Sequence, residues 1–203
     1  MATSNGFNTF RIENLTDGVY AIAMTILILG IKVPVGLDSS NETKIFFARI
    51  FIPLMIYLLS FLILGTYWVG THIQHHFTAK TDRILLWINI LLLMIISVIP
   101  FSASLLNNYT DDKVSIIFYS INLLSASLCH LLMLYYSRKK KFLKPHVTSV
   151  VFNSVRTRIL LPTFFYLLAI PVSFLVPKYA VLLFFIPLVF DLIPGQVDKE
   201  IEQ

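Results

Sequence analysis

Six long apolar segments constrain what this chain can fold into more than any other feature of the sequence. They cover roughly residues 14–33, 45–71, 84–106, 114–136, 158–176 and 179–194. Because about 20 apolar residues in an α-helix cross the hydrocarbon core of a bilayer, each segment predicts one transmembrane helix. The composition agrees, since hydrophobic residues make up 57% of the 203 positions and charged residues only 13%, far from the balance of a soluble domain.

We therefore expect an all-α, polytopic membrane protein with a single six-helix domain over residues 1–203, surrounded by the lipid bilayer. A β-barrel would need strands of about ten residues with alternating hydrophobicity, and the apolar run at residues 90–96 does not alternate. The last segment is short and contains Pro187, which predicts a kink or a tilt there.

The distribution of lysine and arginine predicts the orientation of these spans. Eleven of the 16 basic residues would lie on one side of the membrane: Arg11, Lys80, Arg83, Arg138, Lys139, Lys140, Lys141, Lys144, Arg156, Arg158 and Lys199. Cytoplasmic loops are enriched in these residues, so we expect both termini in the cytoplasm. The basic segment from Arg138 to Arg158 would lie against the anionic inner leaflet, which explains the net charge of +5 without a nucleic-acid partner.

Charged residues crowd the start of the first apolar segment, at Arg11, Glu13 and Asp17. One explanation is structural: Thr16 or Asp17 caps the helix by accepting a hydrogen bond from free backbone N–H groups, and Arg11 follows the positive-inside rule. The other is functional, because carboxylates within membrane spans often mark ion paths. The residues alone leave both explanations open.

A short motif lies in the same place, where Arg11 is followed by Leu15-Thr16-Asp17 and then by Gly18-Val19. It resembles the first-helix signature of the transmembrane protein 175 family of potassium channels: Arg, three variable residues, Phe-Ser-Asp, then Gly-Val. Arg11 and Asp17 match, while Leu15 replaces Phe and Thr16 replaces Ser. Further positions that look like the family are Trp68, His72, Asn89, Pro100 and Phe101. Prokaryotic members have one six-helix unit per chain and form homotetramers in the cell membrane, so the resemblance implies the same here.

The resemblance also implies that helix one lines the pore and that a polar network holds it to its neighbours. The pore-lining and selectivity positions would be Ile22, Thr25, Ile26 and Leu29. The structural network would comprise Arg11, Thr16, Asp17, His72 and Asn89. At about 100° per residue, Ile22, Ile26 and Leu29 fall within about 60° of one another. They can form one stripe, although so uniformly apolar a span offers similar stripes in other directions.

The implied activity is a potassium channel with a hydrophobic constriction, because the Thr-Val-Gly-Tyr-Gly filter of other potassium channels is absent from this sequence. Potassium holds its water less tightly than sodium. Isoleucine rings that force partial dehydration would therefore favour potassium, and other weakly hydrated monovalent cations, over sodium. Thr25 hydroxyls would lend oxygen atoms beside these rings, and the same rings could gate the pore by expelling water.

Two other classes of function were compared with the channel. A proton- or ion-coupled transporter could use Asp17, Asp191 and the histidines as a relay, but no repeated half or matching pair of interrupted helices supports it. A membrane enzyme would need converging acids, bases or a metal, and no such set is visible. His72 and His76 near Asp82 could suggest zinc, but histidine is tolerated at a membrane exit, so we expect neither metal nor cofactor.

Overall fold

The computed structural model describes residues 9–32 and 42–191 of the chain, and every named element in these ranges is helical. Helix α1 (Thr9–Ile26) continues as a 3-10 turn, η1 (Leu27–Gly30). Four long helices follow: α2 (Glu42–Phe77), α3 (Arg83–Asn108), α4 (Lys113–Lys139) and α5 (Ser149–Leu175). Three short elements come last: α6 (Pro177–Ala180), η2 (Val181–Phe184) and α7 (Phe185–Asp191).

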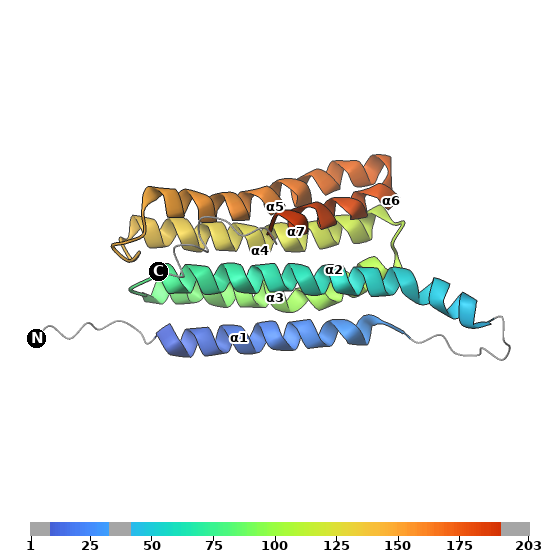
Figure 1. Cartoon of the computed structure of the whole chain (residues 1–203), viewed down its shortest axis with the longest axis horizontal. Helices are drawn as coiled ribbons and strands as arrows, with labels where there is room; N and C mark the ends of the chain where they lie inside the picture. The colour runs from blue at the N-terminus through green and yellow to red at the C-terminus, as the bar shows by residue number, and fades with distance from the viewer. Residues whose placement is uncertain (1–8, 33–41, 192–203) are drawn as a thin grey trace, which may run out of the picture.

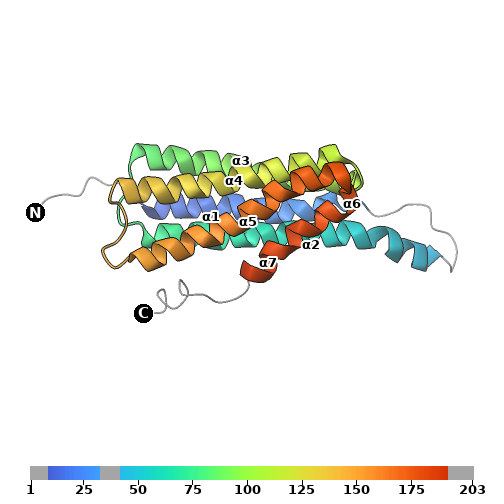
Figure 2. The same cartoon turned by 90° about the horizontal axis from the view of Figure 1, so that it is seen from above.

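The long helices run side by side along the long axis of the molecule (Figure 1). Helix α3 packs against α1, α2 and α4, and α4 packs against α5, so α1 and α5 lie at opposite edges of the bundle. After α5 the chain reverses, and α7 runs back along the bundle to contact α2 and α5 (Figure 2). Helix α1 is therefore covered on one side by α2 and α3, while the described chain leaves its other side uncovered.

The inner sides of the helices meet in a core that runs through the bundle. Its fully buried members include Ile63 in α2, Ile96 in α3, Leu123 in α4 and Phe184 in η2. A second cluster joins the ends of α2 and α4 to the start of α5: Ile73, Phe77, Leu134, Val151, Phe152 and Val155. Because lipid tails are as apolar as leucine, close van der Waals packing holds such a core together within a membrane.

Five of the predicted spans are helices whose length and composition suffice to cross a bilayer: Arg11–Gly30, Arg49–Phe77, Arg83–Asn108, Lys113–Lys139 and Ser149–Leu175. The predictions of an all-α fold and of a membrane protein are thus confirmed. Helix ends differ from the predicted ends, because hydropathy marks the part within lipid rather than the whole helix. Helix α2 has 36 residues, about 54 Å at 1.5 Å per residue, which exceeds a hydrocarbon core of about 30 Å.

The sixth predicted span, residues 179–194, is not one continuous α-helix over its described part, and residues 192–194 lie outside the described residues. From Pro177 to Asp191 the chain passes through α6, η2 and α7, each of 4 to 7 residues. Pro187 explains the interruption, because it has no N–H to donate to the Leu183 carbonyl and its ring would clash with that carbonyl. It is tolerated in the first turn of α7, where backbone N–H groups need no helical partner.

Candidate functional site

The four residues predicted to line a pore lie together on the uncovered face of α1 and η1. Ile22, Ile26 and Leu29 are 61%, 45% and 77% exposed in the single chain, and Thr25 is also exposed. The Thr25 hydroxyl donates a hydrogen bond of 2.9 Å to the Ile22 carbonyl, which leaves the lone pairs of its oxygen available on the same face. The face thus combines apolar side chains with one hydroxyl oxygen, that of Thr25.

The opposite face of α1 is buried in the bundle at Tyr20, Ala23 and Leu27. The two faces differ in exposure because, within the described chain, only the buried face packs against other helices, α2 and α3. The change to a 3-10 turn at Leu27 also affects the exposed face, since side chains three residues apart eclipse in a 3-10 helix. Leu29 is thereby brought into line with Ile26 rather than rotated away from it.

A buried hydrogen bond joins α1 to α3 near the cytoplasmic end predicted for both. The Asn89 side-chain amide donates to the Thr16 hydroxyl oxygen at 3.1 Å, and the two residues are only 2% exposed. A buried polar group without a partner costs free energy, so this pair specifies how α1 sits on α3. Two residues of the predicted network are therefore direct partners.

A second hydrogen bond joins α1 to α2. The Trp68 indole N–H donates to Asp17 Oδ1 at 2.8 Å, and the His72 ring lies 5.9 Å from the Trp68 ring, centroid to centroid. Arg11 is exposed and, within the described residues, has no ion pair or hydrogen bond with Asp17. The structure thus brings Asp17 and His72 together through Trp68 and leaves Arg11 outside this contact.

A polar chain through the centre of the bundle includes His130, which was not among the predicted network residues. The Tyr20 and Thr71 hydroxyls are 3.1 Å apart, and His130 Nε2 lies 3.4 Å from Thr71 Oγ1. On its other side, His130 Nδ1 lies 3.3 Å from the Gln74 amide nitrogen, and the ring stacks on Tyr67 with centroids 5.4 Å apart. The signal was the polar spacing of residues 67, 71 and 74, which share one face of a helix.

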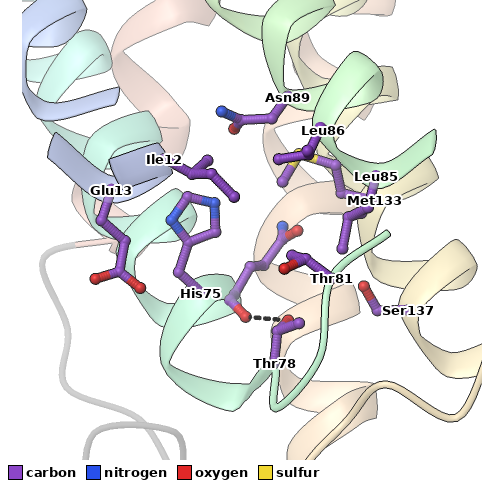
Figure 3. A pocket seen from close by; sticks show the side chains of 11 residues that line it. Ile12, Glu13, His75, Thr78, Thr81, Leu85, Leu86, Asn89, Met133 and Ser137 are labelled. Atoms are coloured by element: carbon purple, nitrogen blue, oxygen red, sulfur yellow. Dashed lines mark hydrogen bonds between the residues drawn. The ribbon is translucent and has the colours of Figure 1, made fainter. Parts of the chain in front are cut away.

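A small cavity of about 20 Å³ lies beside this chain, where α1, α2, α3 and α4 meet. Figure 3 shows Asn89 and His75 pointing into it, with Glu13 at its edge. The side-chain oxygens of Gln74 and Asn89 line it and have no hydrogen-bond partner in the described chain. A cavity of this size accommodates one water molecule, which can donate a hydrogen bond to one of these oxygens.

The loop between α2 and α3 is held by Asp82. Its Oδ1 accepts a hydrogen bond of 2.8 Å from the Leu85 backbone N–H and caps α3, while the Tyr136 hydroxyl donates to Oδ2 at 2.6 Å. Partial burial raises the pKa of Asp82, but these hydrogen bonds to its ionised form outweigh burial and hold the pKa below its ordinary value. Asp82 therefore ties α3 to α4 as a carboxylate.

Within residues 9–32 and 42–191, no group of three His, Cys, Asp or Glu side chains is placed to hold a metal ion.

Comparison with known proteins places this arrangement in a family. The sequence model of the family described as endosomal/lysosomal potassium channel TMEM175 matches residues 11–100, which include most of α1, the Asp17–Trp68 contact and the Thr16–Asn89 pair. A solved structure, a lysosomal potassium-selective channel TMEM175 homologue from Chamaesiphon minutus, shares the fold. It has a TM-score of 0.74 and 24% identity, covering 90% of this chain and 95% of that one.

Sequence relatives extend over most of the chain. A protein named as a potassium channel from Streptomyces collinus is 30% identical over 169 residues, which is 81% of this chain and 82% of that protein. Another so named, from Chryseobacterium, is 26% identical over 95% of each chain. A third, from Chamaesiphon minutus, is 38% identical over half of each chain. The relative from Streptomyces collinus, at 30% identity over 81% of this chain, together with the family model that matches residues 11–100, shows that the chain belongs to the family of the endosomal/lysosomal potassium channel TMEM175.

Proposed function

We propose that this protein is a potassium-permeable ion channel, not an enzyme, and that it works as a homotetramer in the cell membrane with both termini in the cytoplasm. The observation that carries the proposal is the uncovered apolar face of α1, with Ile22, Ile26 and Leu29 exposed in the single chain. The names of three relatives as potassium channels support the choice of ion.

The exposed face of α1 fits a pore better than it fits lipid alone. The polar contacts of Thr16 and Asp17 fix the rotation of α1 on α2 and α3, and that rotation directs Ile22, Ile26 and the Thr25 hydroxyl away from the bundle. Four copies arranged around an axis would therefore present the same residues to a common centre. The rings of isoleucine would form the constriction and the gate, with Leu29 as the next ring outward.

Selectivity in such a pore follows from dehydration. Few oxygen atoms replace the water that an ion loses between apolar rings, so the ion with the more weakly held water passes more easily. Potassium and other weakly hydrated monovalent cations are therefore favoured over sodium, and the Thr25 hydroxyls reduce the barrier beside the rings. The preference is modest, because no ring of backbone carbonyls is offered as in filter-type potassium channels.

A flux assay tests the proposal directly. Purified protein in liposomes should dissipate a potassium gradient faster than an equal sodium gradient, and planar bilayers should show unitary currents. Equal rates for the two ions would reject potassium preference. Flux without unitary current would instead favour the proton- or ion-coupled transporter, in which Asp17, Asp191 and the histidines form a relay.

A further inference from the structure

A large cavity on the side of α2 that faces α7 is not used by the proposed pore. It has a volume of about 350 Å³ and is lined mainly by apolar side chains of α2 and α7, including Leu62, Val69 and Leu188. Arg158 of α5 and Asp191 at the end of α7 are its charged members. An apolar cavity above about 300 Å³ with a few placed polar groups is typical of a ligand site.

The backbone of α2 keeps this cavity open. Gly65 lines it, and a Cβ atom added to Gly65 would meet no other atom within 4 Å. A side chain at this position would therefore extend into the cavity without disturbing the packing of the bundle. Leu62 and Val69, one turn away on either side, are 46% and 44% exposed, so the apolar wall is continuous with the outer surface of the helix.

The charged end of the cavity has one positive and one negative side chain. Arg158 and Asp191 both line the cavity, and because a guanidinium has five N–H donors, some of them can be offered to a phosphate while others face a carboxylate. A smaller cavity of about 50 Å³ shares both residues and is lined by polar groups of Thr66, Ser127 and His130. The two charges thus lie at the boundary between an apolar wall and a polar interior.

The depth of this pair matches the headgroup region of a membrane. Arg158 lies about 14 Å along the axis from the start of α5 at Ser149, a helix that begins in the predicted cytoplasmic basic segment. Pockets between transmembrane helices on the cytoplasmic side can bind lipid headgroups, and this one offers one positive and one negative side chain. The occupant must then offer a phosphate to Arg158, a positive charge to Asp191, and a hydrocarbon chain to the apolar wall.

We infer that the cavity between α2, α5 and α7 binds a zwitterionic phospholipid with a primary ammonium headgroup, such as a phosphatidylethanolamine. Arg158 binds its phosphate, Asp191 accepts a hydrogen bond from its ammonium, and an acyl chain lies along Leu62, Val69 and Leu188. Phosphatidylglycerol has no ammonium, and phosphatidylcholine has no N–H to donate, so neither satisfies Asp191. The inference does not depend on the proposed ion conduction, although Trp68, the hydrogen-bond donor to Asp17 of α1, also lines the cavity.

Native mass spectrometry of the purified protein with dioleoyl phosphatidylethanolamine, phosphatidylcholine or phosphatidylglycerol tests the inference. Phosphatidylethanolamine should bind about tenfold more tightly than the other two, the effect of one charge-assisted hydrogen bond. Asp191→Asn should remove this preference, and Gly65→Leu should abolish binding of all three lipids at the site while leaving the fold intact. Arg156→Gln is the matched control, since Arg156 is on the same helix but does not line the cavity, and it should bind as the wild type does.

Two results would overturn the inference. The first is equal binding of the three lipids by the wild type, or a preference that Gly65→Leu leaves unchanged. The second is spontaneous disulfide-linked dimers in vesicles of Gly65→Cys in a Cys129→Ser background, which would place a second copy of the chain where the lipid is expected.

Discussion

Trp68 and Asp17 lie 51 positions apart in the sequence, yet the Trp68 indole N–H donates to the Asp17 carboxylate at 2.8 Å. This contact fixes the exposed edge of α1 to α2, next to the face proposed to line the pore. An indole is a donor only, so its partner must be an acceptor. The pairing explains why an acidic residue is held at this position of a membrane helix.

Replacing Trp68 by Phe keeps an aromatic side chain but removes the indole N–H and the pyrrole part of the ring system. Loss of the hydrogen bond should lower stability by about 1 kcal/mol beyond the effect of the same truncation at a tryptophan that makes no hydrogen bond. Thermal unfolding in detergent micelles would measure this as a lower melting temperature. Trp87→Phe is the matched control, since Trp87 is 60% exposed and makes no hydrogen bond with the described residues. Equal losses in the two variants would show that the Asp17 contact contributes nothing.

Substitution in the buried pair of Thr16 and Asn89 should lower stability more than substitution in the exposed pair of Trp68 and Asp17. Thr16→Val removes the oxygen that accepts from the Asn89 amide and leaves that amide buried, at a cost of about 1 to 3 kcal/mol. Thr16→Ser keeps the hydroxyl and should behave as the wild type. In a double-mutant cycle with Asn89→Leu, the combined loss should be smaller than the sum of the single losses; additive losses would mean that the two side chains do not interact.

The helices could be predicted from the sequence, because each long apolar run has one low-energy solution in lipid. Pro187 also predicted that the last apolar segment is not one straight, continuous helix. The ends of α2 and α5 could not be placed, because their outer turns mix polar and apolar residues and depend on local contacts. At α5, Thr148 accepts a hydrogen bond of 3.3 Å from the Val151 N–H and starts the helix nine residues before the apolar run.

The sequence identified candidate site residues more easily than it identified their hydrogen-bond partners. Resemblance to a family pointed to Thr16, Asp17, His72 and Asn89, but hydrogen-bond partners depend on how helices rotate against one another. Hydropathy carries little information about rotation when every face is apolar. His130 shows the same difficulty, because its hydrogen-bond partners Thr71 and Gln74 both lie on α2, 59 and 56 residues earlier in the sequence.

Low pH should reduce the contribution that Asp82 makes to the stability of the folded protein. Its pKa is lower in the folded protein than in the unfolded chain, so its contribution is complete above about pH 4, the ordinary aspartate pKa. It is then lost as the pH falls toward the folded pKa. Loss of an N-cap costs about 0.5 to 2 kcal/mol. Asp82→Ala should therefore be less stable than the wild type at pH 7, and the difference should shrink at pH 3.

Asp112→Ala provides the comparison for Asp82, because Asp112 is the N-cap residue of α4 but makes no side-chain capping hydrogen bond. Its thermal unfolding should differ little from the wild type at either pH. A loss at Asp82→Ala that does not change between pH 7 and pH 3 would show that packing, not charge, explains the effect.

The proposed orientation can be tested with single cysteines in a Cys129→Ser background. Asp111 lies between α3 and α4, and Lys139 lies at the opposite end of α4; both are exposed. A membrane-impermeant thiol reagent should label Asp111→Cys on intact cells and Lys139→Cys only after lysis. The reverse pattern would invert the orientation, and labelling of both on intact cells would mean that α4 does not cross the membrane.

The proposed pore makes the most specific prediction, because it assigns selectivity to individual side chains of α1. Ile22→Asn or Ile26→Asn would place amide groups where hydrocarbon forces an ion to shed water. Conductance should rise and sodium should pass more nearly as well as potassium. Reversal potentials under opposing potassium and sodium gradients would measure this as a shift toward equal permeability. Ile121→Asn is the control, since Ile121 is 51% exposed on α4, a helix that the proposal keeps away from the pore.

Ile28 is a weaker control, because it is 46% exposed on the same uncovered side of the chain. Asparagine on a lipid-facing surface can lower expression, so only channels that assemble and conduct are compared. If Ile121→Asn shifts the reversal potential while Ile22→Asn and Ile26→Asn leave it unchanged, α1 does not form the constriction. A shift at Ile26→Asn alone would place the narrowest ring there, next to the turn that aligns Leu29 with Ile26, and would leave Ile22 in a wider part of the same pore.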